Sequence, residues 1–90
     1  MRRVKVIIYG DVQGKYFRAG IKEKALFLDL NGYVKNNDDG SVTAILEGDD
    51  ADIEEMIEFC KEGVRGASVD DVEVIEQDFK EEFDDFEIRY

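Results

Sequence analysis

The segment GDVQGKYFRAG, residues 10–20, combines residue types that suit the binding of an anion. Its backbone can turn sharply at Gly10 and Gly14, and every residue keeps its N–H because the segment contains no proline. It follows an apolar run and leads into a helical pattern, and amides that converge at a helix N-terminus form a concave anion site. Arg18 would add a two-pronged donor matched to phosphate oxygens. From these residues alone, an anion site and an ordinary strand–loop–helix connection remain equally open.

Two better-known loop motifs are excluded. Gly14-Lys15 is close to a nucleotide-binding P-loop, but the preceding glycine is too near and no Ser or Thr follows the lysine to hold magnesium. The segment NNDDG is not a calcium loop, because placing Gly40 at its sixth position puts Lys35 and Leu46 where carboxylates are required.

The composition excludes several kinds of chemistry. The 90 residues include no histidine and one cysteine, which removes histidine-dependent catalysis, histidine-ligated metals and intrachain disulfides. The net charge is −11, yet residues 1–36 hold eight Lys or Arg against three acids. The acidic remainder argues against nucleic acid as a partner, whereas a small anion needs only a local positive site. No apolar run approaches the roughly 20 residues of a membrane span, so we expect a cytoplasmic protein.

The hydrophobic periodicity predicts a single domain over residues 1–90. We expect a strand at 3–10, a helix at 18–30, a hairpin of strands 32–37 and 41–48, a helix at 50–63, a strand at 69–78 and a short last strand at 86–90. This order is typical of a ferredoxin-like α+β sandwich (βαββαβ), in which two helices cover one face of an antiparallel sheet. Met56 and Cys60 lie on the apolar stripe of the second helix and are predicted to be core, as are Phe17 and Tyr33.

With these elements in place, the sequence resembles the acylphosphatases, small enzymes that hydrolyse the carboxyl–phosphate bond of acyl phosphates. Two family patterns carry the resemblance. The pattern G-x-V-Q-G-V-x-F-R is matched by Gly10, Val12, Gln13, Gly14, Phe17 and Arg18, and the pattern G-W-V-x-N-x-x-D-G by Gly32, Val34, Asn36, Asp39 and Gly40, with Tyr33 in place of tryptophan. Ala25, Leu30 and a closing F-x-I-x-Y (Phe86, Ile88, Tyr90) extend the match over nearly the whole chain.

The resemblance implies a site and a substrate. Arg18 and the backbone amides of Gly14, Lys15, Tyr16, Phe17 and Arg18 would bind the phosphoryl group, and Asn36 would position the attacking water. We expect Asn36 to lie on a strand beside the first strand, near the loop, and Gln13 to brace the loop. The resemblance implies no metal or cofactor, a small acyl phosphate as substrate and phosphate as product. We also expect a monomer with no nucleic-acid or membrane partner.

Lys15 is the departure that bears on activity, because the family has an apolar residue there, usually valine. It motivates an alternative function, a catalytically weak phosphate-binding or regulatory module on the same fold. Two further alternatives are the amino-terminal domain of a larger maturation enzyme that uses carbamoyl phosphate, which the end of the chain just after a strand disfavours, and an RNA-binding sandwich, which the charge disfavours.

Overall fold

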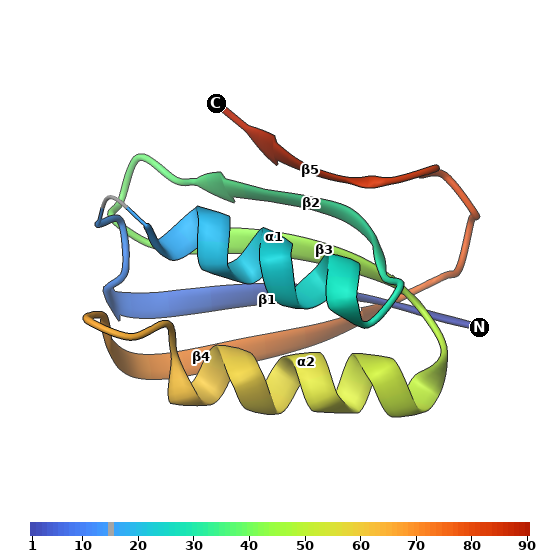
Figure 1. Cartoon of the computed structure of the whole chain (residues 1–90), viewed down its shortest axis with the longest axis horizontal. Helices are drawn as coiled ribbons and strands as arrows, with labels where there is room; N and C mark the ends of the chain where they lie inside the picture. Colours follow the sequence, from blue (N-terminus) through green and yellow to red (C-terminus); the bar gives the residue numbers. More distant parts are fainter. Residues whose placement is uncertain (15) are drawn as a thin grey trace.

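The computed structural model describes residues 1–14 and 16–90, which form one sheet covered by two helices on one face (Figure 1). The elements are β1 (Arg2–Asp11), α1 (Phe17–Phe27), β2 (Asn31–Asn36), β3 (Val42–Gly48), α2 (Asp50–Glu62), β4 (Ser68–Gln77) and β5 (Phe86–Arg89). The strand order is β4-β1-β3-β2-β5. The predicted ferredoxin-like sandwich is therefore confirmed.

Alternation along the strands and a stripe on each helix build the core. Val4, Val6 and Ile8 of β1 all point to the helix side, where each is fully buried. The helices bury their own stripes against this face: Phe17, Ile21 and Ala25 from α1, and Ile53, Met56, Ile57 and Cys60 from α2. The predicted core positions Phe17, Met56 and Cys60 are confirmed.

The first helix is shorter than predicted. It ends at Phe27 rather than at residue 30, because Asp29 takes a positive φ of 55° and the N–H of Leu30 donates back to the carbonyl of Ala25 at 2.9 Å. An apolar stripe continues to Leu30 because this residue turns back into the core, where it is 1% exposed. The periodicity therefore marked burial correctly but not the end of the helix.

The four strands β4-β1-β3-β2 form an antiparallel sheet, and the short C-terminal strand β5 runs parallel to β2. Two expectations about the sheet need correction. Asn36 was expected on a strand beside β1, but β3 lies between β2 and β1. Tyr33 is not a core residue: its neighbour Val34 points into the core, so Tyr33 points to the other face, where its ring meets Phe83 edge-on.

The segment between β4 and β5 is fixed by a buried carboxylate. Glu47, which is 2% exposed, accepts hydrogen bonds from the N–H groups of Lys80 at 3.2 Å and Glu82 at 3.1 Å. The guanidinium of Arg3 balances its charge at 3.3 Å. A buried carboxylate is tolerated when it is paired and hydrogen-bonded in this way, and the contacts direct the chain toward β5 at the opposite edge of the sheet.

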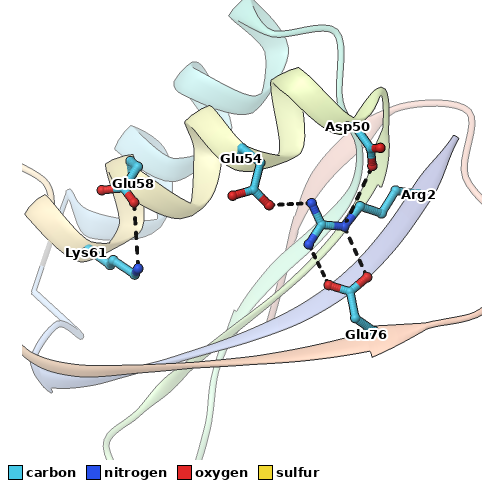
Figure 2. A network of polar contacts seen from close by, with 6 residues as sticks. All are labelled: Arg2, Asp50, Glu54, Glu58, Lys61 and Glu76. Atoms are coloured by element: carbon cyan, nitrogen blue, oxygen red, sulfur yellow. Dashed lines mark hydrogen bonds and ion pairs between the residues drawn. The ribbon is translucent and has the colours of Figure 1, made fainter.

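A second arginine joins α2 to the sheet (Figure 2). Arg2 contacts Glu54 and Asp50 of α2 and Glu76 of β4, with its Nη2 at 2.6 Å from Glu76. The hydrogen bond from Arg2 lowers the pKa of the Glu76 carboxyl, and the same contacts raise the pKa of Arg2. Positive charge at this end of the molecule is therefore already neutralised by the protein itself. None of the helices in the described ranges is long and apolar enough to cross a membrane.

Candidate active site

Three connections meet at one end of the sheet: the loop from β1 to α1, the turn from β2 to β3 and the segment from α2 to β4 (Figure 1). Gly10 starts the first of them. Its φ is +137°, and a Cβ there would lie 2.2 Å from the carbonyl oxygen of Ser68 in β4. The pairing of β1 with β4 shifts between Tyr9 and Gly10. Glycine is required here because two backbones approach closely at a bulge, which turns the chain toward α1.

The N-terminus of α1 carries no negative charge of its own in the described residues. Tyr16 occupies the cap position without a side-chain hydrogen bond to the helix, and the first turn holds no acid. The N–H of Phe17 donates to the carbonyl of Gly14 at 3.2 Å, and the N–H of Gly20 begins the helical pattern by donating to Tyr16 at 2.9 Å. The N–H groups of Arg18 and Ala19 have no acceptor within the helix. By contrast, Asp50 and Asp52 already place negative charge in the first turn of α2.

Gly14 leaves space beside this helix end. An ideal Cβ at Gly14 would meet no atom within 4 Å, and its φ lies outside the left-handed region. The residue lines a hollow of about 180 Å³ together with Tyr16 and Phe17. Glycine at this position is thus not required by the backbone fold, and a side chain here would have open space beside the hollow.

Arg18 is held loosely by the end of β5. Its Nη1 donates to the carbonyl oxygen of Arg89 over a long 3.4 Å, and its guanidinium lies 4.7 Å from the centre of the Tyr90 ring. No carboxylate pairs with Arg18 among the residues that the structure describes. The guanidinium therefore keeps most of its donors and its full charge for a ligand.

Asn36 carries an unusual polar atom. It is the last residue of β2 and shares the helix side of the strand with the buried Val34. Its Oδ1 is buried and has no hydrogen-bond partner, the one such side-chain atom in the described part of the chain. Buried polar groups are nearly always hydrogen-bonded, so an orphaned acceptor at the end of a strand near a loop is typical of a functional group.

Gln13 joins the two parts of the site. Its Nε2 donates to the carbonyl oxygens of Asn37 at 2.7 Å and Ser41 at 2.8 Å, which ties the loop before α1 to the β2–β3 turn. The prediction that Gln13 braces the loop is confirmed. This contact joins the loop to the residue that follows Asn36, although β3 separates their strands.

The β2–β3 turn is itself stiffened. Asn37 Nδ2 donates to the hydroxyls of Ser41 at 2.9 Å and Thr43 at 2.7 Å. The hydroxyl and N–H of Ser41 donate to Asp39, which holds the pKa of that carboxyl below its ordinary value. Sequence analysis did not find these supports, whose only signal was a cluster of Asn, Asp and Ser around Gly40.

The structure brings most of the predicted site residues to the same end of the sheet. Gly14, Tyr16, Phe17 and Arg18 surround the start of α1, and the Gln13 contact places Asn36 at the same end. Lys15 lies outside the described residues. Across residues 1–14 and 16–90, no group of three or more Cys, Asp or Glu residues could hold a metal ion.

Comparisons with known proteins agree with this geometry. The family model of the acylphosphatases matches residues 4–88. An acylphosphatase of Haloarcula marismortui is 50% identical over 98% of this chain and 96% of that protein. The crystal structure of the Bacillus subtilis acylphosphatase superposes with a TM-score of 0.95 at 34% identity and covers both chains completely.

A similar domain also occurs within a larger protein. The structure of full-length HypF in its phosphate- and nucleotide-bound form matches 99% of this chain and 12% of that chain, with 32% identity and a TM-score of 0.90. The match to the family model, the relatives of nearly equal length and the shared fold lead to one conclusion: the chain belongs to the acylphosphatase family, whose members hydrolyse acyl phosphates.

Proposed function

We propose that Arg18 and the amides at the start of α1 bind the phosphoryl group of the substrate, and that Asn36 orients the attacking water. The observation that carries this division of roles is the orphaned Oδ1 of Asn36, a buried acceptor that a bound water would satisfy. Arg18 supports it from the other side, as a guanidinium without a carboxylate partner in the described chain.

The chemistry follows from the charge of the reaction. In the transition state, negative charge spreads over the three outer oxygens of the phosphoryl group, and these are the atoms that Arg18 and the amides would contact. The leaving carboxylate is already a weak base, so the bond between phosphorus and the acyl oxygen breaks without a general acid. One O–P bond forms from the water while the bond from phosphorus to the acyl oxygen breaks.

Asn36 would act by position alone. A carboxamide is not a base at neutral pH, but its oxygen accepts a hydrogen bond from the water and so aims the lone pair at phosphorus. The proton of the water would pass to an oxygen of the phosphoryl group under attack, which is the most basic group nearby. The products are then a carboxylate and inorganic phosphate.

The oligomeric state, the partners and the cellular location of the protein are part of the same proposal. The charge of −11 opposes self-association and the binding of nucleic acid, which supports a monomer that meets only small molecules. The lone Cys60 is fully buried and needs no disulfide partner, in keeping with the reducing cytoplasm.

The test measures hydrolysis and phosphate binding side by side. Arg18→Gln is expected to lower kcat/KM on benzoyl phosphate at least about a hundred-fold and to weaken phosphate binding in an NMR titration. Asn36→Ala is expected to lower kcat by a similar factor while leaving phosphate binding within about two-fold. Lys5→Gln removes a positive charge on the face of the sheet away from the helices, and Asn31→Ala on β2 repeats the asparagine change away from the site, so both serve as controls.

The roles would be wrong if Arg18→Gln and Asn36→Ala kept the parent's turnover. Tight phosphate binding by the parent with negligible turnover would favour the alternative, a phosphate-binding module. Lys15→Val distinguishes a further case, because a large gain in turnover in that variant would show that the lysine impairs a site built for catalysis.

A further inference from the structure

The hollow beside the loop has a second wall that the proposed roles do not use. Its near side is formed by Asp11, Gly14, Tyr16 and Phe17, and its far side by residues 64–67 of the segment between α2 and β4. The volume of about 180 Å³ leaves room for more than a phosphate. Because Gly10 and Asp11 pair with Val69 and Ser68, both walls are attached to neighbouring strands and keep their spacing.

The order of the strands places this hollow on the opposite side of the loop from Asn36. The loop follows β1, which has β4 on one side and β3, then β2, on the other. The Gln13 contact joins the loop to the β2–β3 turn beside Asn36, whereas the hollow opens toward the start of β4. Figure 1 shows the two connections on either side of the loop.

Phosphoryl transfer needs the attacking and leaving oxygens roughly in line. If water is held on the Asn36 side, as proposed above, the acyl group must leave on the other side, toward residues 64–67. The hollow is then the site of the acyl group, an assignment that rests on the proposed function.

Arg65 is the one basic residue among the described residues that line this hollow. It makes no hydrogen bond or ion pair with any residue in the described ranges, whereas Arg2, Arg3, Lys24, Lys61 and Arg89 each pair with a carboxylate. Like Arg18, Arg65 is therefore an arginine without a carboxylate partner in the described chain, and it can bind an anionic ligand. Without it, the charged side chain that lines the described walls is that of Asp11, which would repel anions.

The backbone around Arg65 forms a turn between α2 and β4. The N–H of Ala67 donates to the carbonyl of Val64 at 2.9 Å, and Gly66 has a φ of +90°. These are the marks of a tight turn with a positive φ at its third residue, which puts Arg65 at the second residue, with its side chain free of the sheet.

We propose that Arg65 is a specificity residue, and that this enzyme favours acyl phosphates whose acyl group carries a second anionic group, a carboxylate or a further phosphate. The guanidinium would form a charge-assisted hydrogen bond with that group while the phosphoryl end is held by the loop. Because Arg65 contacts a part of the substrate that does not react, it acts mainly on KM.

The test compares two rigid substrates of nearly equal size, benzoyl phosphate and 4-carboxybenzoyl phosphate, at one ionic strength. The flat ring keeps the added carboxylate away from its own acyl phosphate. Arg65→Gln is expected to lower kcat/KM on 4-carboxybenzoyl phosphate about three- to ten-fold, through KM, and to leave benzoyl phosphate within about two-fold. Arg65→Lys is expected to restore part of the loss, since it keeps the charge but not the fork.

Lys61→Gln is the matched control, because it removes one positive charge from α2 outside the hollow. The inference is overturned if Arg65→Gln changes both substrates equally, or if Lys61→Gln lowers the preference as much. Failure of the proposed function looks different, since Arg18→Gln and Asn36→Ala would then keep the parent's turnover on both substrates, whatever Arg65→Gln does. Far-ultraviolet circular dichroism and thermal melts confirm that each variant is folded.

Discussion

The side-chain amide of Gln13 donates a 2.7 Å hydrogen bond to the carbonyl oxygen of Asn37, across 24 residues of sequence. One partner belongs to the loop that precedes α1 and the other follows Asn36 directly. The relative position of the proposed phosphate-binding loop and of Asn36, the residue proposed to orient water, therefore depends on a contact in which neither residue needs to touch the substrate.

Gln13→Glu removes this contact while keeping the shape of the side chain. A carboxylate has no N–H to donate and would face two carbonyl oxygens, so the loop and the turn should separate. We expect kcat on benzoyl phosphate to fall about ten-fold, with a smaller change in KM, because the geometry of attack suffers more than binding. Steady-state kinetics measure both values.

Gln77→Glu on β4 makes the same chemical change at a residue whose side chain accepts a hydrogen bond from Arg3 at the other end of the strand from the site. It should leave both constants unchanged. Equal kinetics for Gln13→Glu and the parent would show that the loop and turn hold their places without the amide.

Replacing Asn36 and Asn37 by alanine should have opposite consequences for stability. Asn36→Ala removes an oxygen that has no partner in the described chain, so the free energy of unfolding should fall by less than about 0.5 kcal/mol or rise. Asn37→Ala leaves two partly buried hydroxyls, those of Ser41 and Thr43, without a donor and should cost about 1–3 kcal/mol. Urea unfolding curves compare the two, and an equal loss in both variants would contradict the assignment of Asn36 as an unsatisfied group.

Gly14→Ala should separate binding from folding. The added Cβ meets open space, so the unfolding midpoint should stay close to that of the parent, while the narrower hollow should raise KM about three- to ten-fold. Gly10→Ala is the contrast, because its Cβ would collide with the backbone of Ser68 at a positive φ and should destabilise the fold strongly. Thermal melts and kinetics on both variants check this, and a Gly14→Ala protein with unchanged KM would show that the hollow does not hold substrate.

The contact between Arg2 and Glu76 predicts a dependence of stability on pH. Hydrogen bonds from Arg2 lower the pKa of Glu76 in the folded protein below its value of 4.5 in the unfolded chain. The stabilisation is therefore fully present above pH 4.5 and is lost as the pH falls through the lower, folded value. The difference in unfolding free energy between the parent and Glu76→Gln should be constant from pH 6 to 8 and shrink below about pH 4.5.

Asp70→Asn serves as the control, since Asp70 lies on the same strand and has no ion pair with any described residue. Urea titrations at several pH values measure the differences directly. A difference in unfolding free energy between the parent and Glu76→Gln that stays constant down to pH 3 would contradict the pairing of Glu76 with Arg2.

Local patterns predicted most of the fold. The hairpin of β2 and β3 could be found because Asp39-Gly40 interrupts two apolar strands, and Gly40 does take a positive φ of 94°. The apolar stripes of both helices were predictable because buried residues recur at helical spacing. The end of α1 was not, because Asp29 rather than a glycine takes the left-handed conformation there.

The site was only partly predictable. The helix start and Arg18 follow from physical chemistry, but Asn36 was identified through its place in a family pattern. The contact of Arg18 with Arg89 joins residues 71 apart in the sequence. It depends on β5 running parallel to β2, and the four residues of β5 do not indicate in which direction this strand pairs. The sequence around Arg65 does not indicate a role for it, because the proposed role depends on its place beside the loop that precedes α1, which only the fold determines.

The central position of β1 bears on how the chain folds. This strand pairs with β3 and with β4, where Arg3 lies opposite Gln77. Pairings between such distant residues form slowly, because a long loop must close first. During synthesis, β1 can pair with β3 early, but its other edge stays unpaired until β4 has been synthesised. Nascent chains arrested before residue 68 should therefore be more sensitive to protease than those arrested well beyond residue 77.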